Sequence, residues 1–208
     1  RAVQLMEALR AIPEGVEFRY VLPLSETRLL VEYTRFTRIV TPLEELAELG
    51  RRWLAERAPE GYELIRSERA HIPMGLHPLS SQGEPHHQDK HLGVPIGTRA
   101  GMTRDATGYG FVEMHAWARG AAAELLRGDA PSPYREPRLR AWMDSCLLRL
   151  IEERPELLPD IFMRLTTMYP DDFARFMTYG GLRESIALIL KAPKRPFICA
   201  AIGRCNWA

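Results

Sequence analysis

The stretch that decides the fold is RYVLPLSETRLLVEYTRF, from Arg19 to Phe36. β-branched and aromatic residues dominate its two halves, and Ser25-Glu26 separates them as a short polar turn. The pattern predicts a β-hairpin with strands over residues 16–24 and 27–36. Within the second strand, Glu32 is an acidic residue in an otherwise apolar and aromatic setting. A carboxylate in such a setting has to be paired or used in chemistry.

Further elements are expected on the C-terminal side of this hairpin. Thr41 predicts an N-cap, with Pro42 at the first helical position, for an amphipathic helix that ends near residue 58. Residues 62–74 predict a third strand, residues 75–91 a polar loop, and residues 93–97 a short buried strand. A turn-rich segment then leads into a helix over residues 111–126. From residue 138 onward the chain is strongly helical, with helices predicted over 140–152, 157–168, 171–179 and 182–190.

The composition is that of an ordinary globular protein. Of its 208 residues, 46% are hydrophobic and 26% are charged, with a formal net charge of +1. This balance argues against a dedicated nucleic-acid binder, and the sequence predicts no membrane-spanning helix. Three widely spaced cysteines indicate a reducing compartment without a disulfide framework. The sequence opens on Arg1 in mid-pattern, so we expect it to be the C-terminal portion of a longer protein.

A second candidate site lies between Gly97 and Leu126. Glycine-bearing turns precede a helix there, and free N–H groups at a helix N-terminus favour negative or electron-rich ligand atoms. A glycine-rich connection that binds nothing explains the same residues equally well. Glu32 has a comparable alternative, a solvent-facing strand glutamate, although it shares a strand face with Leu30. The same alternative applies to Glu68 in the predicted third strand.

Metal-ligating residue types gather in the polar loop, namely His86, His87, Asp89 and His91. Their spacing fits no standard ligand pattern, so a solvated loop is the better interpretation and no metal site is predicted. The apolar stripes of the C-terminal helices indicate core packing, with the lining of an apolar tunnel or membrane docking as alternatives.

Taken in order, these segments resemble the bacterial lycopene cyclase family. The resemblance covers nearly the whole chain and rests on the ordered set of segments rather than on any single motif. The matching segments are FRYVLPLSETRLLVEYTRF, Glu68 followed by IPM, IGTRAGMTRDATGYGF, MDSCLLRLI, ELLPDIFMRL and KAPKRPFICA.

The resemblance implies an α+β fold, the C-terminal part of a two-domain FAD-binding flavoprotein of the Rossmann, glutathione-reductase-like type. Residues 1–92 would belong to the substrate-binding domain with its antiparallel sheet, and residues 93–128 would end the FAD-binding domain. Residues 129–208 would form a helical C-terminal region. The family's N-terminal segment, which binds the FAD diphosphate, is expected to precede residue 1.

By the same resemblance, the family's catalytic glutamate falls on Glu32. Many members carry a second acid where Tyr33 stands, so the resemblance implies a single acid, aided by Glu68 or by the Tyr33 hydroxyl. Met102 stands where related flavoproteins have an Asp that contacts the ribityl chain, so backbone groups are expected to replace that contact. The implied cofactor-binding residues are Gly97, Ala100, Gly101, Met102, Thr107, Gly108 and Tyr109.

The activity implied is that of a lycopene β-cyclase in carotenoid biosynthesis, a redox-neutral cyclisation of the ends of lycopene to β-rings. Lycopene has no polar group, so the reaction begins with protonation of a terminal double bond, and burial in apolar surroundings raises a carboxyl pKa and keeps that proton available. Reduced FAD, with NAD(P)H as reductant, would stabilise the resulting cation.

The expected partners are lycopene and related acyclic carotenoids. We expect a cytoplasmic protein peripheral to the membrane, with no nucleic acid and no obligate protein partner. One alternative is a related flavoprotein reductase or monooxygenase that acts on another isoprenoid. The other is a non-catalytic carotenoid- or lipid-binding relative, in which Glu32 is merely structural.

Overall fold

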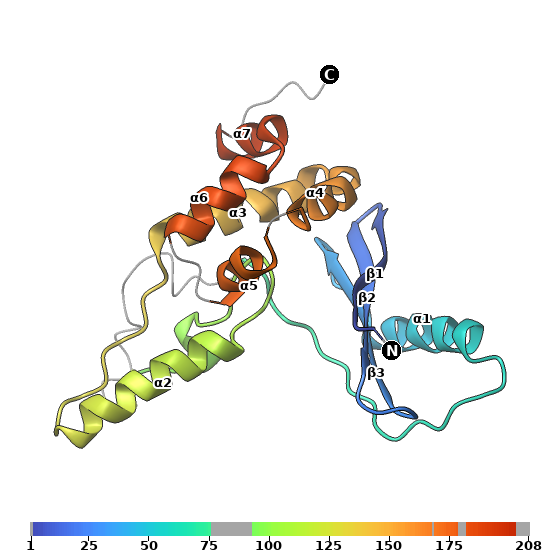
Figure 1. Ribbon diagram of the computed structural model, residues 1–208, viewed down its shortest axis with the longest axis horizontal. Coiled ribbons are helices and arrows are strands. Elements are labelled where there is room, and N and C mark those ends of the chain that lie inside the picture. Colours follow the sequence, from blue (N-terminus) through green and yellow to red (C-terminus); the bar gives the residue numbers. More distant parts are fainter. Residues whose placement is uncertain (1, 76–92, 168, 179–181, 203–208) are drawn as a thin grey trace. The chain divides into compact units, whose positions relative to one another are not determined.

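The computed structural model describes residues 2–75, 93–167, 169–178 and 182–202 (Figure 1). The chain divides into two compact units. The first comprises Arg1–Ile72 and Leu150–Ile161, and the second comprises Pro73–Arg149 and Phe162–Ala208. Each unit has its own buried residues, so each is described by itself.

The first unit is built on a three-stranded antiparallel sheet in the order β1-β2-β3. Its strands are β1 (Gln4–Ile12), β2 (Gly15–Pro23) and β3 (Leu29–Thr37). The predicted hairpin is therefore confirmed as β2 and β3. Its turn is stabilised by the Ser25 hydroxyl, whose Oγ accepts hydrogen bonds from the backbone N–H groups of Thr27 at 3.3 Å and Arg28 at 3.1 Å.

The strand β1 was not predicted, and its irregular pairing explains why. Its register against β2 shifts twice, between Gln4 and Glu7 and between Glu7 and Arg10. Met6 and Ala8 adopt positive φ angles of 55° and 50°. Bulges of this kind interrupt the two-residue alternation by which a strand is recognised in a sequence.

Helix α1 (Leu43–Arg57) confirms the predicted amphipathic helix and lies beside the sheet (Figure 1). Ion pairs join it to two strands, Glu45 with Arg35 of β3 and Arg57 with Glu7 of β1. The predicted N-cap is wrong by one residue, because Pro42 holds that position and makes no side-chain cap. The carbonyl of Thr41 instead lies 2.7 Å from Nε2 of His71.

The predicted third strand over residues 62–74 is wrong. The chain has no regular secondary structure there and joins no sheet, and β1 supplies the third strand instead. Leu64 and Ile65 are 63% and 68% exposed, so the apolar residues that suggested a strand are not buried in this unit. An apolar run makes a strand only where a neighbouring strand accepts its backbone hydrogen bonds.

A second, short part of the chain completes the first unit. The 3₁₀ turn η2 (Pro155–Leu157) contacts both β1 and β2. Residues from β2 and from this part are fully or almost fully buried, namely Val16, Phe18, Leu150, Ile151, Leu158 and Ile161. The core of the unit therefore depends on residues that lie more than a hundred positions after the sheet in the sequence.

The second unit is helical. Each helix predicted from residue 111 onward is confirmed in place, with bounds that differ by a few residues, and α7 was not predicted. Besides η2, the helical elements after residue 93 are η1 (Gly97–Ala100), α2 (Phe111–Leu126), α3 (Arg138–Glu153), α4 (Leu158–Leu165), α5 (Pro170–Thr178), α6 (Leu182–Lys191) and α7 (Lys194–Ile202). Residues 150–153 of α3 and 158–161 of α4 belong to the first unit. The predicted buried strand over residues 93–97 is wrong, since no strand forms there and Ile96 is 61% exposed.

The buried residues of the second unit come from different helices. Met143 of α3, Phe176 of α5 and Leu188 of α6 pack together, with Leu139, Leu165, Phe173, Met177 and Ala187 around them. Cys146 is a buried free thiol, and burial raises its pKa. Cys199 is disulfide-bonded, which departs from the expectation of a chain without disulfides.

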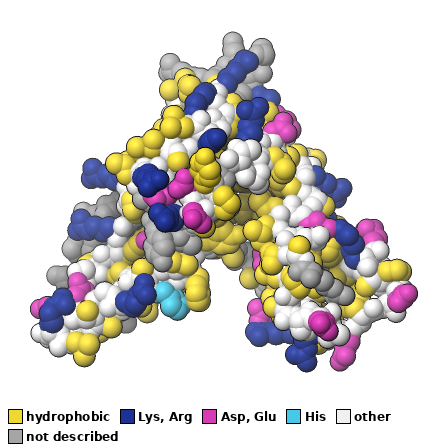
Figure 2. All heavy atoms as spheres, viewed as in Figure 1, with side chains coloured by type: hydrophobic (Ala, Val, Ile, Leu, Met, Phe, Trp, Pro, Cys, Tyr) yellow, Lys and Arg dark blue, Asp and Glu magenta, His cyan; other side chains and the backbone are white. Residues whose placement is uncertain are grey.

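The described helices include none with the length and apolar character required to cross a bilayer. Many apolar side chains nevertheless remain at the surface, where they lie among Lys and Arg (Figure 2).

Candidate functional site

The hairpin of β2 and β3 has two faces with opposite chemistry, because side chains alternate along a strand and paired residues share a face. One side is mostly apolar, and we call it the apolar face. Its cross-strand pairs are Val16 with Phe36, Phe18 with Thr34, Tyr20 with Glu32, and Leu22 with Leu30. The Phe18 ring meets Tyr20 and Phe36 edge to face, with centroids 5.2 and 5.1 Å away.

Glu32 supplies the only carboxylate of the apolar face among the residues of β2 and β3, all of which the structure describes. Its Oε1 accepts a hydrogen bond of 2.9 Å from the Thr34 hydroxyl on the same face. The side chain is exposed, so the structure does not bury Glu32 in a cavity, and Leu30 next to it is 43% exposed. A carboxyl group at this position would contact any ligand that binds to the apolar face.

The opposite side of the hairpin, which we call the charged face, is organised around Glu17. This carboxylate is fully buried and accepts hydrogen bonds from Arg10 at 2.6 Å, Arg35 at 3.0 Å and the Tyr33 hydroxyl at 2.8 Å. Arg19 adds a contact of 3.3 Å. Burial acts to raise the pKa of Glu17, but the hydrogen bonds from Tyr33 and the arginines outweigh it and lower the pKa.

The three predicted catalytic residues have different hydrogen-bond and ion-pair partners. Tyr33 follows Glu32 in β3 and therefore points to the charged face, where its ring lies under the Arg19 guanidinium at 4.4 Å. Burial and the hydrogen bond to Glu17 raise the pKa of its hydroxyl. The side chain of Glu68 is 70% exposed and forms an ion pair with Arg66.

The predicted cofactor-binding segment forms η1 and a set of turns before α2. Gly97, Gly101 and Gly108 have φ angles of 62°, 71° and 71°, a region that favours glycine. A Cβ at Gly97 would meet no atom within 4 Å, so the backbone at this point is open to a ligand. Met102 is 1% exposed, so its side chain is committed to the core and leaves only backbone groups for a contact.

A buried ion pair, which was not predicted, anchors this segment to α3. Arg104 donates from Nε to Oδ2 of Asp144 at 3.2 Å, and it also pairs with Oδ1. The same guanidinium donates to the carbonyl of Phe176 at 3.3 Å and lies 4.6 Å from that ring. The Arg104 carbonyl in turn accepts the N–H of Gly108 at 2.8 Å, so the ion pair fixes the turn that holds Thr107, Gly108 and Tyr109.

Neither charge of this pair had a signature in the sequence, since a lone Arg and a lone Asp forty residues apart look like surface residues. The side chains that bind Glu17 did have a signature in the sequence. We call Glu17 with Arg10, Arg19, Tyr33 and Arg35 the Glu17 cluster. Charged or polar residues recur every second position in both strands, as Glu17 and Arg19 in β2 and as Tyr33 and Arg35 in β3. Such a repeat marks one shared face of a hairpin.

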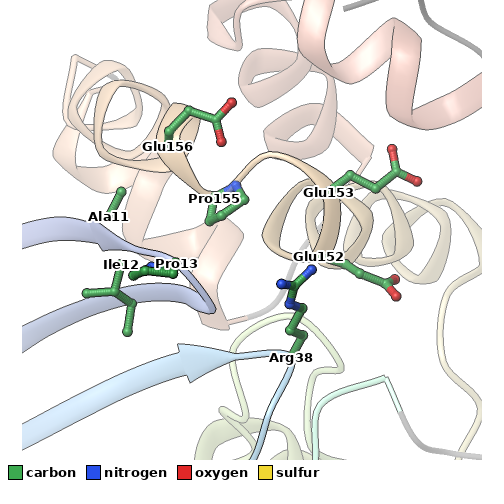
Figure 3. Close-up of a pocket in the computed structure, with 8 residues that line it drawn as sticks. All are labelled: Ala11, Ile12, Pro13, Arg38, Glu152, Glu153, Pro155 and Glu156. Carbon is green, nitrogen blue, oxygen red and sulfur yellow. The ribbon is translucent and has the colours of Figure 1, made fainter.

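A separate hollow of about 480 Å³ lies in the first unit (Figure 3). It is lined by Ala11, Ile12, Pro13, Arg38, Glu152, Glu153, Pro155 and Glu156. Its charged lining does not suit a hydrocarbon, and it contains none of the predicted site residues.

The histidines considered as metal ligands, at positions 86, 87 and 91, lie outside the described residues. Within the described part of the chain, no three His, Cys, Asp or Glu side chains come together in a way that could hold a metal ion.

Comparison with known proteins identifies a family for this chain. A family model described as lycopene cyclase protein matches residues 1–200. No curated protein and no solved structure matches the chain. The family match spans nearly the whole sequence and supports a carotenoid cyclase function. The chain therefore belongs to the lycopene cyclase family.

Proposed function

We propose that the chain acts in a lycopene β-cyclase, which converts the acyclic ends of lycopene to β-rings, and that Glu32 donates the proton that starts the reaction. The observation that carries this proposal is the position of Glu32 on the apolar face beside Tyr20, Leu22 and Leu30. Aromatic and aliphatic side chains suit a hydrocarbon, and a single carboxyl group among them supplies the acid that the chemistry needs.

The proton transfer follows from this placement. A polyene chain laid across the apolar face would exclude water from Glu32, so its carboxyl group would face the hydrocarbon directly. The carboxyl proton then passes to the terminal double bond, and the tertiary cation formed is attacked by the neighbouring double bond to close a six-membered ring. A base then removes a ring proton, and the C–H electron pair forms the ring double bond. The product is an isomer of the substrate, so no net oxidation occurs. We assign the first proton to Glu32 alone, since Tyr33 and Glu68 make other contacts.

The residues from Gly97 to Tyr109 fit FAD through backbone groups. Gly97 leaves its backbone open, Tyr109 is 43% exposed, and Met102 contributes no side chain. We propose that Gly97, Ala100, Gly101, Met102, Thr107, Gly108 and Tyr109 hold the flavin in this way. Flavin held by these residues and kept reduced by NAD(P)H would supply negative charge that favours a developing cation.

Glu32→Gln is the variant that tests the assignment. In a lycopene-producing host, we expect the gene product to lose β-ring formation by a factor of about 100 or more, because the amide has no acidic proton to donate. Glu26→Gln, in the exposed turn of the same hairpin, is the matched control and should leave the rate unchanged. Pigment analysis measures both. Normal β-carotene formation by Glu32→Gln would refute the assignment, and a redox product instead of an isomer would refute the cyclase activity.

We also propose peripheral membrane association, because lycopene dissolves in bilayers and not in water. Helix α6 supports this proposal. It buries Ser185 and Leu188 but exposes Leu182, Ile186 and Leu190, and it ends at Lys191. A helix that exposes apolar side chains and ends in a lysine is suited to bind the surface of a bilayer that contains anionic lipids. We expect the gene product to sediment with such vesicles and Ile186→Glu/Leu190→Glu to sediment less, whereas equal sedimentation of both proteins would contradict the role of α6.

A further inference from the structure

The Glu17 carboxylate uses its acceptor positions fully. Oε1 accepts from Arg10 and Arg19, and Oε2 accepts from Tyr33 and Arg35. Three positive charges and one hydroxyl therefore converge on one buried group. Hydrogen bonds to a charged acceptor contribute more to stability than neutral ones, and a buried charge that loses its partners is costly.

These contacts join all three strands in register. Arg10 of β1 pairs with Glu17 of β2, which pairs with Arg35 of β3, so the three residues form one row across the sheet. Arg19 and Tyr33 form the neighbouring pair of β2 and β3. A slip of β3 by one residue would turn Tyr33 and Arg35 to the apolar face and strip Glu17 of two partners. The cluster thus selects the observed register over its nearest alternatives.

The same register decides where Glu32 lies. Because Tyr33 is held on the charged face, its neighbour Glu32 must point to the apolar face, opposite Tyr20 and beside Thr34. A shift by one residue would carry the Glu32 carboxyl to the arginine-rich side of the sheet. We infer that Glu17 and Tyr33 are positioning residues, which set the face and the register of Glu32 without touching the substrate. This inference rests on the proton-donor role proposed for Glu32.

The test compares Tyr33→Phe with Val21→Ala. The first keeps the aromatic ring under Arg19 and removes only the hydroxyl that binds Glu17. The second lies on the same face of β2, opposite Val31, and leaves the charge row intact. Rates are measured with the purified gene product, reduced FAD and lycopene in liposomes, and are corrected for the folded fraction by circular dichroism.

We expect Tyr33→Phe to lower kcat about tenfold, because small misplacements of a reacting group are costly, with KM and the shape of the pH profile unchanged. Val21→Ala should leave the corrected kcat unchanged. The double variant Glu32→Asp/Tyr33→Phe should lose less kcat than the product of the two single losses. Both substitutions act through the position of one carboxyl group, so their effects are not independent. Glu17→Asp, which keeps the charge, should retain more activity than Glu17→Gln.

Each of the following results would contradict a different part of the proposal. If Tyr33→Phe alters the pH profile or abolishes activity, Tyr33 acts in proton transfer and is not a positioning residue. If its corrected kcat equals that of the parent, the cluster is only structural. If Glu17→Gln fails to fold, the comparison of Tyr33→Phe with Val21→Ala still tests whether Tyr33 is a positioning residue. If Glu32→Gln retains full activity, the proposed function fails independently of the result at Tyr33.

Discussion

Glu17 and Glu32 show how two carboxylates of one hairpin acquire different chemistry. Glu17 is buried and fully paired, so it stays ionised and structural. Glu32 is exposed and shares one hydrogen bond with Thr34 on the apolar face. The residue type is the same, and only the strand face differs. A fixed ion suits a structural role, whereas a carboxyl group that a ligand can desolvate suits acid catalysis.

The stability of the first unit should depend on the ionisation of Glu17. Its pKa is lowered in the folded chain, because the hydrogen bonds from Tyr33 and Arg10 outweigh the effect of burial. A lowered pKa gives stability that is present above the unfolded pKa of about 4.3 and is lost as the pH falls through the folded value. We therefore expect the midpoint of thermal unfolding to fall as the pH drops below about 4.3.

Glu17→Gln should be less stable at neutral pH by about 3 kcal/mol, since it leaves Arg19 and Arg35 without their buried partner. Its unfolding midpoint should also depend less on pH in the acid range. Glu26→Gln serves as the control, because it removes an exposed carboxylate. Parallel pH curves for the parent and Glu17→Gln, measured by circular dichroism, would contradict this account.

At the scale of elements, the two hairpins of the sheet could be predicted from the sequence to different extents. The hairpin of β2 and β3 has uninterrupted alternation and a polar turn, and it was predicted within a few residues. The bulges at Met6 and Ala8 interrupt the alternation along β1, so the sequence does not predict this strand. Residues 62–74 have strand-forming side chains but no partner, and pairing is a property of the whole sheet. For the same reason the sequence could not show that Glu32 is exposed or that the Glu17 cluster forms, since both depend on cross-strand contacts. The catalytic role of Glu32 stays a prediction.

Gly15 is the residue on which the turn between β1 and β2 depends. A Cβ added there would lie 1.9 Å from the Phe36 carbonyl oxygen, and this oxygen belongs to a backbone fixed by β2–β3 pairing. Gly15→Ala should therefore cost about 3 kcal/mol in the free energy of unfolding, because the strands must move apart.

The control for Gly15→Ala is Gly120→Ala in α2, where an added Cβ meets no atom within 4 Å. Alanine at that exposed helix position should stabilise by about 0.5–1 kcal/mol. Urea unfolding measures both variants. A Gly15→Ala protein as stable as the parent would show that Phe36 and β3 yield easily, and the register argument for Glu32 would weaken with it.

At the scale of the whole molecule, the boundary between the two units passes through single helices. Residues 138–149 of α3 belong to the second unit, while residues 150–153 belong to the first. Residues 158–161 of α4 belong to the first unit, where Leu158 and Ile161 are buried, and residues 162–165 belong to the second. Each unit nevertheless has its own determinant of stability. Leu158 contributes to the buried core of the first unit, and the buried ion pair of Arg104 with Asp144 lies in the second.

Two variants should therefore destabilise different units. Leu158→Ala removes a fully buried side chain and should cost about 3 kcal/mol, and we expect faster amide hydrogen exchange in β1 and β2. Asp144→Asn leaves the Arg104 guanidinium buried without a counter-charge and should cost about 3–5 kcal/mol. Its faster exchange should appear in the turn that contains Gly108 and in α5, since Arg104 binds both.

Hydrogen exchange followed by mass spectrometry distinguishes the two patterns, because it measures the exchange rate separately for peptides of the sheet and peptides of the helices. If Asp144→Asn accelerates exchange in β2 as much as in α5, the chain unfolds as one cooperative body and the division into two units has no energetic meaning. If the patterns stay separate, the sheet that positions Glu32 folds independently of the turn proposed to hold the flavin. A variant at one proposed site can then be tested without loss of the other.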